Sequence, residues 1–402
     1  MTAPTRVEFD PYSDDFFQHP YEIYKRMRDE APVYYSEKYD FYALTRHADV
    51  TAAFKDFETY SSARGVDLAM VQSGQVPPAP LVIMLDPPDH RRMRSLVNRV
   101  FTPNAVKKLE PMVREVIGHY LGQLDPNGFD VVDDFSALFP CEIITRMLGV
   151  PEENRQQIRL WLDESLHREP GQVGTSEAGI EAGVASGLMY YELIQQRRAE
   201  PQDDMISRLI EVEVEREDGT VTKLDDVEIT GFASLLGGAG AETVTKLIGN
   251  AAVAFHQNPD QWQMLLDDRE LIPAAVEELL RYQAPAQYVV RWCTKDVELH
   301  GTTIPANNAV FVIAGSANRD ERAFPDPDKF DILRPRDQSI HVGLGYGIHS
   351  CLGAALARME SRIALEMMLD FMPKFEVDMA GCKRVAMTNV AGYKHIPARV
   401  LS

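Results

Sequence analysis

Cysteine is scarce in this sequence, and the four that occur, Cys141, Cys293, Cys351 and Cys382, stand far apart. Such spacing argues against a disulfide scaffold and fits the reducing cytoplasm, where we expect the protein to be located. Long hydrophobic runs are also absent: none approaches the roughly 18 apolar residues of a membrane span, and the N-terminus lacks the apolar core of a secretory signal. We therefore expect a globular protein with no membrane anchor.

Positive charge is in short supply as well. The sequence has 41 Lys and Arg residues against 61 Asp and Glu residues, a formal net charge of −20. A polyanion would be repelled over most of such a surface, so no nucleic acid is expected as a partner. Apolar residues make up 45% of the 402, which is enough for a large buried core and excludes a fibrous or disordered chain.

Helical patterns dominate the chain, and no linker or repeat divides it, so we predict a single mainly α domain over residues 1–402. The longest helix is predicted over 225–257, where Asp225 caps the first turn and Glu228 reaches back to it. At about 1.5 Å per residue, this helix is long enough to cross the whole domain. The other predicted helices span residues 20–30, 49–57, 90–101, 104–124, 152–167, 179–198, 271–282 and 354–371.

Strand-like runs are short and few, which predicts small antiparallel β-sheets. Residues 33–35 and 41–44 flank one turn, and residues 297–300 and 309–314 flank another at 301–305. The proline-rich stretch 73–88 contains an apolar run and is predicted to be a packed loop. The polar, glycine-bearing stretch 169–179 is predicted to be a mobile loop.

The strongest local signal is a glycine-framed cysteine, Gly343-Leu-Gly-Tyr-Gly-Ile-His-Ser-Cys351-Leu-Gly353, followed by an apolar-periodic helix. The glycines let the backbone turn tightly, approach a flat or bulky group and point N–H groups at the sulfur. The positive end of the helix dipole favours the thiolate. Such a sulfur is a nucleophile, a redox thiol or a metal ligand; the alternative is a small buried apolar residue. Zinc is not indicated, because no second cysteine or histidine cluster lies at ligand spacing.

A second unusual segment, Leu235-Leu-Gly-Gly-Ala-Gly-Ala-Glu242-Thr243, lies in the middle of the long helix. Three glycines inside a helix cost roughly 1 kcal/mol each relative to alanine. They predict either close packing against another helix or space for a ligand. In the second case, Glu242 and Thr243 place an acid and a hydroxyl beside that space.

Charged residues stand in apolar or acid-free surroundings at three further places. Glu278 and Arg281, three apart in an apolar helix, form either a charge-assisted pair or an ordinary surface pair. Arg291 lies in an apolar segment, where a buried anion would explain it. His90 and Arg94 share one helix face and can hold an anion together. They begin a run, 90–109, that contains no acidic residue. This run binds carboxylates, docks an acidic partner or is only the solvated face of a helix. Its basic residues are Arg91, Arg92, Arg94, Arg99, Lys107 and Lys108.

The order of these motifs along the chain resembles the cytochrome P-450 family of haem–thiolate monooxygenases. The His/Arg helix comes first, then the glycine-broken helix with Glu-Thr, then Glu-x-x-Arg, then Gly-x-Gly-x-His-x-Cys-x-Gly. The resemblance covers nearly the whole chain, including 324–330 and 392–397, and points to the soluble bacterial class. It implies the single-domain cytochrome P-450 fold, a haem b cofactor and an oxidoreductase that inserts one atom of dioxygen into its substrate.

The resemblance also implies a role for each matching residue. Cys351 matches the proximal iron ligand, whose thiolate favours cleavage of the O–O bond. Thr243 matches a residue that orients water at the bound dioxygen, and Glu242 matches one that relays protons. Glu278 and Arg281 match a structural pair behind the proximal loop. The residues at haem-contacting positions are His90, Arg94, Ala239, Gly240, Arg291, Gly345, His349, Cys351 and Gly353.

The segments that match substrate-contacting regions are mainly apolar, which indicates a lipophilic substrate of the terpenoid, steroid, lipid or polyketide class, to be hydroxylated or epoxidised. Residues 166–187 are expected to belong to a lid. The residues predicted to line the substrate pocket are Val82, Ile83, Met84, Leu235, Ala239, Val289, Val290, Asn389 and Val390.

Electrons are expected from a separate protein, because the sequence carries no flavin or iron–sulfur motif and hence no separate reductase domain. The basic run from Arg91 to Lys108 is predicted to dock an acidic ferredoxin or flavodoxin. Three other readings stay open: a haem–thiolate enzyme that uses hydrogen peroxide directly or catalyses a rearrangement, a haem-based gas or redox sensor, and a helical binding protein without a cofactor. The pair Glu242 and Thr243 favours activation of dioxygen.

The sequence departs from the family pattern at two positions near the expected haem. Leu344 replaces the aromatic residue usual seven positions before the cysteine, and packing around the sulfur tunes the reduction potential. Lys329 stands where an arginine often joins the Glu/Arg pair, and a lysine cannot make the same bidentate contact.

Overall fold

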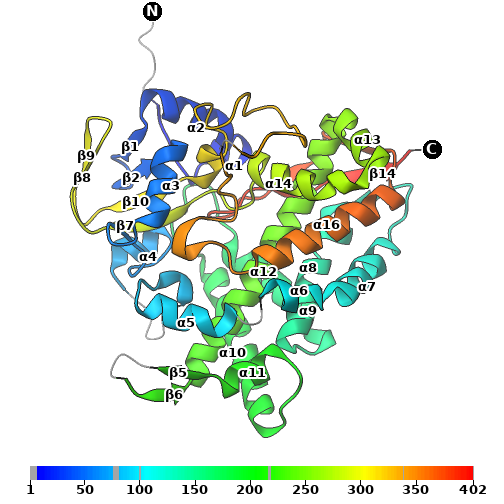
Figure 1. Ribbon diagram of the computed structural model, residues 1–402, viewed down its shortest axis with the longest axis horizontal. Coiled ribbons are helices and arrows are strands. Elements are labelled where there is room, and N and C mark those ends of the chain that lie inside the picture. The colour runs from blue at the N-terminus through cyan, green and yellow to red at the C-terminus, as the bar shows by residue number, and fades with distance from the viewer. Residues whose placement is uncertain (1–6, 76–80, 99–100, 216–218, 338, 402) are drawn as a thin grey trace, which may run out of the picture.

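A helix of 32 residues, α12 (Asp226–Gln257), runs through the middle of the protein (Figure 1). The computed structural model describes residues 7–75, 81–98, 101–215, 219–337 and 339–401. Asp225 accepts a hydrogen bond from the Glu228 backbone, and the Glu228 carboxylate accepts one from the Asp225 backbone, which confirms the predicted capping box. Every residue from 244 to 255 is buried, so this half of α12 is covered by other elements on all sides.

The covering helices explain two of the glycines in α12. A side chain at Gly237 would collide with the hydroxyl group of Tyr190, and one at Gly240 would come within 3.0 Å of Ile144. Close helix packing, one of the two alternatives that the sequence left open, is therefore a reason for both glycines, and Gly240 also lines a cavity. The helices that pack against α12 include α8 (Phe139–Leu148), α9 (Glu152–Leu166), α10 (Glu177–Ala199) and α16 (Ala354–Phe371).

The predicted helices are present, with one division and several omissions. The predicted helix 104–124 is two helices, because Pro111 begins a new one instead of continuing the first. The sequence reading missed α8, in which eight of ten residues are buried. The other helices are α1 (Asp14–Gln18), α2 (Pro20–Glu30), α3 (His47–Lys55), α4 (Leu68–Ser73), α5 (Asp89–Asn98), α6 (Pro103–Lys107), α7 (Glu110–Leu121), α11 (Met205–Glu211), α13 (Pro259–Asp267), α14 (Ile272–Tyr282) and α15 (Ala314–Ala317), with short turns η1 (Val82–Met84), η2 (Val132–Ser136), η3 (Arg269–Leu271) and η4 (Gly347–His349).

The largest sheet is mixed and not purely antiparallel. β1 (Val33–Ser36) pairs with β2 (Phe41–Leu44) as predicted, but β10 (Ala309–Val312) pairs with β2 in parallel and with β7 (Val289–Cys293) antiparallel. The predicted pairing of 297–300 with 309–314 is wrong, because the first segment pairs with the residues of the turn itself. The remaining strands are β3 (Tyr60–Ser61), β4 (Phe129–Asp130), β5 (Glu213–Glu215), β6 (Val221–Lys223), β8 (Val297–Leu299), β9 (Thr302–Ile304), β11 (Phe375–Val377), β12 (Lys383–Arg384), β13 (Tyr393–His395) and β14 (Pro397–Val400).

The stretch predicted to be a mobile loop, 169–179, and the residue before it are each tied to a distant part of the chain. The Arg168 backbone N–H donates to the Ala386 carbonyl at 2.9 Å, and that of Gly171 donates to the Tyr12 carbonyl at 2.6 Å. From Glu177 onward the predicted lid is part of α10. Residues 76–80 of the predicted packed loop, and Arg99 of the basic run, lie outside the described residues.

Candidate functional site

A cavity of about 190 Å³ is bounded by α12 on one side and by the cysteine loop and α16 on another. Ala239, Gly240 and Thr243 line it from α12, and Cys351 lines it from the loop that precedes α16. Motifs that are far apart in the sequence therefore line a single cavity. The other lining residues are Val82, Ile83, His90, Arg94, Phe101, Ile144, Phe232, Leu235, Leu236, Val244, His349, Ser350, Leu352, Gly353, Leu356, Ala357 and Glu360.

The cysteine loop owes its shape to glycines that no other residue could replace. At Gly343 a Cβ would collide with the Leu280 carbonyl of α14, and Gly347, with φ of +72°, lies against the Phe54 carbonyl. The Cys351 backbone N–H donates to the Leu344 carbonyl at 2.7 Å and closes the loop.

The Cys351 side chain lines two pockets, the cavity of about 190 Å³ and a second one of about 400 Å³. Burial raises the pKa of this thiol, although a hydrogen bond from Gly353 and the charges of Arg94 and Arg358 lower it in part. Burial, which favours the neutral thiol, thus opposes the positive end of the helix, which favours the thiolate. A coordinated metal cation ionises the sulfur directly, because it displaces the proton of a coordinating thiol.

Basic side chains at one edge of the cavity lack an anion. Both ring nitrogens of His90 are buried without a hydrogen-bond partner among the described residues, and the ring lies 4.3 Å from that of His349. Burial lowers the pKa of His90 to about 4 and that of His349 to about 3, with neighbouring arginines adding to both effects. Arg291 is 6% exposed, and burial lowers its pKa to about 10. This donor set fits a cofactor with carboxylate groups, as haem propionates are.

All but two of the residues predicted to contact haem line the cavity. Gly345 instead lines a second pocket, of about 400 Å³, which also contains Leu344 and Cys351. Arg291 is outside the lining but close to His349, whose pKa its charge depresses. Arg94 donates a hydrogen bond to the Ser350 carbonyl and so ties α5 to the cysteine loop.

Of the two residues predicted to handle protons, only one lines the cavity. Thr243 lines the cavity, and its hydroxyl donates to the Ala239 carbonyl at 3.0 Å. Glu242 does not line it. Its carboxylate is 2.8 Å from the Lys246 ammonium, and both side chains are 4% exposed. The direct placement of Glu242 in the cavity, expected from the sequence, is therefore corrected.

The predicted substrate-pocket residues divide into two groups. Val82, Ile83, Leu235 and Ala239 line the cavity. Val290 lies in the aromatic core of the N-terminal region, since side chains alternate along β7 and its neighbour Arg291 takes the other face; the prediction is wrong for this residue. The residues outside this cavity that stay predictions are Met84, Val289, Asn389 and Val390.

Glu278 and Arg281 form a buried pair of two hydrogen bonds, 2.7 and 2.8 Å long, so the surface alternative is excluded. The third member is Arg334, whose Nε is 3.2 Å from the Glu278 carboxylate. The expectation that Lys329 holds this place is wrong: its ammonium is 64% exposed and pairs with Asp331.

The sequence reading missed Glu360, which lines the cavity from α16. It is 2% exposed, one carboxyl oxygen has no partner among the described residues, and burial raises its pKa well above the usual range. An acid on the apolar row that Leu356 and Ala364 form, at a spacing of four residues, was the signal that could have revealed it.

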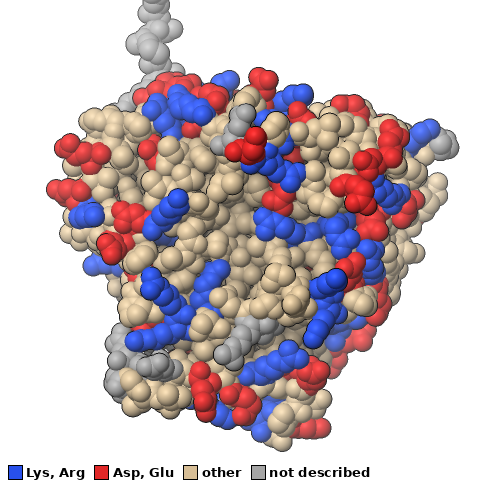
Figure 2. Space-filling model, in the orientation of Figure 1, with Lys and Arg blue, Asp and Glu red and all other residues tan. Residues whose placement is uncertain are grey.

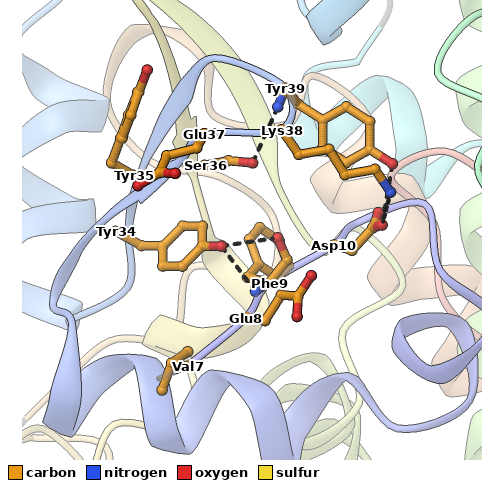
Figure 3. Close-up of a pocket in the computed structure, with 10 residues that line it drawn as sticks. All are labelled: Val7, Glu8, Phe9, Asp10, Tyr34, Tyr35, Ser36, Glu37, Lys38 and Tyr39. Carbon is orange, nitrogen blue, oxygen red and sulfur yellow. Dashed lines mark hydrogen bonds and ion pairs between the residues drawn. The ribbon is translucent and has the colours of Figure 1, made fainter. Parts of the chain in front are cut away.

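A further pocket, of about 270 Å³, lies between the N-terminal segment and the β1–β2 turn (Figure 3). Lys38 and Tyr39 both point to the Asp10 carboxylate, at 2.8 and 3.1 Å, and the Tyr34 hydroxyl bonds to the Phe9 backbone. These groups already satisfy one another, so they offer no binding chemistry to a ligand.

The protein is thus mainly helical, and its cavity brings a cysteine sulfur, buried basic side chains and apolar walls together. Residues 187–390 match the family model described as Cytochrome P450. The chain is 38% identical over 393 residues, which is 97% of this chain and 96% of the other, to the Putative cytochrome P450 123 of Mycobacterium tuberculosis. It is 37% identical to the Vitamin D(3) 25-hydroxylase of Pseudonocardia autotrophica, covering 91% of this chain and 89% of the other.

A solved structure agrees with these relatives. A mutant of P450 EryK in complex with erythromycin B superposes with a TM-score of 0.86 at 34% identity, over 96% of this chain and 97% of the other. The chain belongs to the cytochrome P450 family. It is accordingly a haem–thiolate monooxygenase that binds haem b. None of its described helices has the length and hydropathy needed to span a membrane.

Proposed function

We propose that the protein hydroxylates or epoxidises a lipophilic small molecule of the terpenoid, steroid, lipid or polyketide class, with electrons from a separate ferredoxin or flavodoxin. One observation carries the proposal: Cys351 and Thr243 line a single cavity whose other walls are mainly apolar. Such walls bind a hydrocarbon skeleton by burial and leave few polar groups to select among substituents. The names of two similar proteins, a vitamin D(3) hydroxylase and an erythromycin B complex, support substrates of this size and polarity.

The residues of the chain bind the cofactor and manage water and protons around it. Cys351 would ligate the iron, while His90, Arg94, Arg291 and His349 would hold the propionates. When bound, the haem supplies activation of dioxygen, which the thiolate ligand promotes. The Thr243 oxygen, whose proton goes to the Ala239 carbonyl, is free to accept a hydrogen bond from water in the cavity and so to orient it. Glu242 would relay protons to that water.

The partners and the organisation of the chain are part of the same proposal. Residues 1–402 act as one catalytic domain, and a separate electron donor docks on its surface. The basic residues of α5 and α6 flank the cysteine loop through Arg94 and suit an acidic donor. We place the reaction in the cytoplasm, in keeping with the free cysteines of the described chain.

The proposal is tested in two measurements on the purified protein. Reduction under carbon monoxide is expected to give the strongly red-shifted Soret band of a thiolate-ligated haem, and Cys351→Ser is expected to abolish it. Titration with a panel of terpenoids, steroids, fatty acids and macrolides should then shift the Soret band for at least one class. A protein that lacks the red-shifted band while intact would overturn the proposal, and binding confined to polar compounds would overturn the substrate class.

A further inference from the structure

Helix α10 carries a row of exposed apolar side chains. Eleven large apolar side chains are exposed among the described residues, and four of them belong to this one helix. They are Ile180, Val184, Leu188 and Tyr191, each between 43 and 58% exposed. We infer that two copies of the protein pair through these rows, so that α10 of one copy packs antiparallel against α10 of the other. The inference goes beyond the proposed function and does not depend on it.

The helix is apolar on two sides, and the chain covers only one of them. The covered side packs against α9, α11 and α12, in the lower part of the molecule in Figure 1. Its buried apolar residues are Ala182, Tyr190, Leu193 and Ile194. A surface helix normally carries polar residues opposite its buried side, and a contiguous exposed apolar patch marks an interaction site. The second apolar side of α10 therefore calls for a partner.

The apolar row has an acidic residue at one end and a basic residue at the other. Glu177 stands three residues before Ile180, and Gln195 and Arg198 follow Tyr191 at spacings of four and three; all are exposed. Steps of three and four residues keep side chains on one helix face. This face is therefore acidic near the N-terminus of α10, apolar in the middle and basic near the C-terminus.

A face with this order is complementary to an inverted copy of itself. When two α10 helices run antiparallel and cross at residues 187 and 188, Glu177 of each copy lies opposite Arg198 of the other. In the same register Val184 lies opposite Tyr191 of the second copy. A parallel pair would instead place like charges together. The antiparallel arrangement has twofold symmetry, so it closes as a dimer. Charge complementarity thus selects a second copy as the occupant.

Two glycines beside the apolar row give the second helix room to approach. A Cβ at Gly183 or at Gly187 would have no described atom within 4 Å, whereas one at Gly179 would collide with Thr175. Packing against the described part of the chain therefore explains Gly179 but not the other two. Glycine inside a helix is destabilising relative to alanine. A hole at Gly187, next to Leu188, accepts the leucine of the second copy.

Arg198 has the capacity to reach the second copy although it has a partner in its own chain. Its Nε and Nη2 donate to the Asp226 carboxylate at 2.8 and 2.6 Å, and its side chain is 36% exposed. A guanidinium has five N–H donors in a planar fork, so it can hold two carboxylates at once. Its Nη1 is not used in the pair with Asp226 and suits Glu177 of the second copy.

The first test is sedimentation equilibrium of the purified holoenzyme. Wild type is expected to dimerise with a Kd in the micromolar range, as a small interface of one helix face gives. Leu188→Asp should raise this Kd roughly a hundredfold or more, because each dimer then buries two charges in its apolar contact. Met379→Asp, at an exposed apolar position far along the chain, is the control and should dimerise like wild type. A wild type that stays monomeric, or a dimer that survives Leu188→Asp, would overturn the inference.

The second test examines the antiparallel register. Glu177→Arg and Arg198→Glu should each weaken dimerisation roughly tenfold, because each replaces two ion pairs per dimer by two repulsions. An equimolar mixture of the two variants should recover the wild-type Kd, since every mixed dimer again contains two Glu–Arg pairs. Helical circular dichroism equal to that of wild type shows that the variants are folded. A mixture that dimerises no better than either variant alone would overturn the inference.

The third measurement examines a lipid surface as the other occupant of the apolar row. No flotation of wild type with phosphatidylcholine vesicles is expected, because the row ends in charged residues on a protein with a net charge of −20. A monomeric wild type that floats with the vesicles and loses this binding on Leu188→Asp would assign the row to lipid and overturn the pairing of two copies.

Discussion

At the scale of one residue, Arg291 is a buried charge whose energetic cost depends on whether an anionic cofactor is bound. The side chain is 6% exposed, and no ion pair joins it to a carboxylate of the described residues, although the charge of Asp86 attracts it. Its guanidinium donates to the adjacent Val290 carbonyl at 3.2 Å. A buried arginine without an ion-pair partner destabilises the protein unless an anion binds next to it. We therefore predict that the residue serves binding of the haem propionates at a cost to the stability of the apoprotein.

Replacing this residue should separate the two effects. Arg291→Met is expected to weaken haem binding roughly tenfold to a hundredfold, the equivalent of a charged hydrogen bond. The free energy of unfolding of the apoprotein should not fall, because an unpaired buried charge is removed. Haem loss to a scavenging protein and urea denaturation measure the two quantities. Arg399→Met, at an exposed pair with Glu376, is the control and should leave haem loss unchanged.

His90 makes the apoprotein sensitive to acid. Burial lowers the pKa of His90 to about 4, below the ordinary value of 6.5 that the unfolded chain retains. Between these values the unfolded state binds more protons, so stability decreases as the pH falls, by up to about 1.4 kcal/mol per pH unit. Above pH 6.5 the effect is absent.

Removal of the imidazole should flatten this dependence. For His90→Phe we expect a smaller loss of apoprotein stability between pH 6.5 and 4 than for wild type, measured by urea denaturation at several pH values. His119→Gln, at an exposed position in α7, should follow the wild-type curve. Parallel curves for His90→Phe and wild type would show that His90 does not titrate in this range.

At the scale of elements, one carboxylate joins α14 to the segment before the cysteine loop. Glu278 accepts two hydrogen bonds from Arg281, one from Arg334 and one from the Asp331 backbone. Arg281 also donates to the Asn318 and Pro327 carbonyls. This network holds the segment in place behind the cysteine loop, whose Gly343 packs on the Leu280 carbonyl of α14.

Because Arg334 belongs to this network and Lys329 does not, we expect the two residues to contribute differently to the free energy of unfolding. Arg334→Met is expected to lower the free energy of unfolding by about 2 kcal/mol, because Glu278 loses a charged hydrogen bond in a buried setting. Lys329→Met should change it by less than about 0.5 kcal/mol, since its pair with Asp331 is exposed. Denaturant titration of both variants checks the difference. Equal losses would mean that Lys329 shares the role of Arg334.

At the scale of the whole molecule, charge is distributed unevenly despite the net value of −20. Figure 2 shows Lys and Arg side chains gathered over α5 and α16, around a central area of uncharged residues, while Asp and Glu lie mainly toward the rim. Lys107 and Lys108 are exposed at the end of α6. A positive area on a negative protein orients an acidic partner during approach.

Charge reversal on this face should slow electron delivery. The double variant Lys107→Glu/Lys108→Glu is expected to be reduced roughly threefold to tenfold more slowly by an acidic ferredoxin at low salt, and the difference should shrink as salt rises. Stopped-flow reduction at several ionic strengths measures it. Lys295→Glu, exposed in the turn after β7, serves as the control. A rate independent of both lysines would place the docking surface elsewhere.

The sequence by itself determined most of the helices and the motifs that are expected to bind the cofactor. The long helix with its capping box and the glycine-framed Cys351 follow from local rules, because caps, glycines and apolar periodicity act between residues close in the chain. Only the tertiary structure decided which distant side chains meet. It put Arg334 in place of Lys329, paired β10 with β2 in parallel within the main sheet, and paired Glu242 with Lys246 outside the cavity lining. Those outcomes depend on how helices and strands pack, and packing joins residues whose separation along the chain leaves no periodic signal.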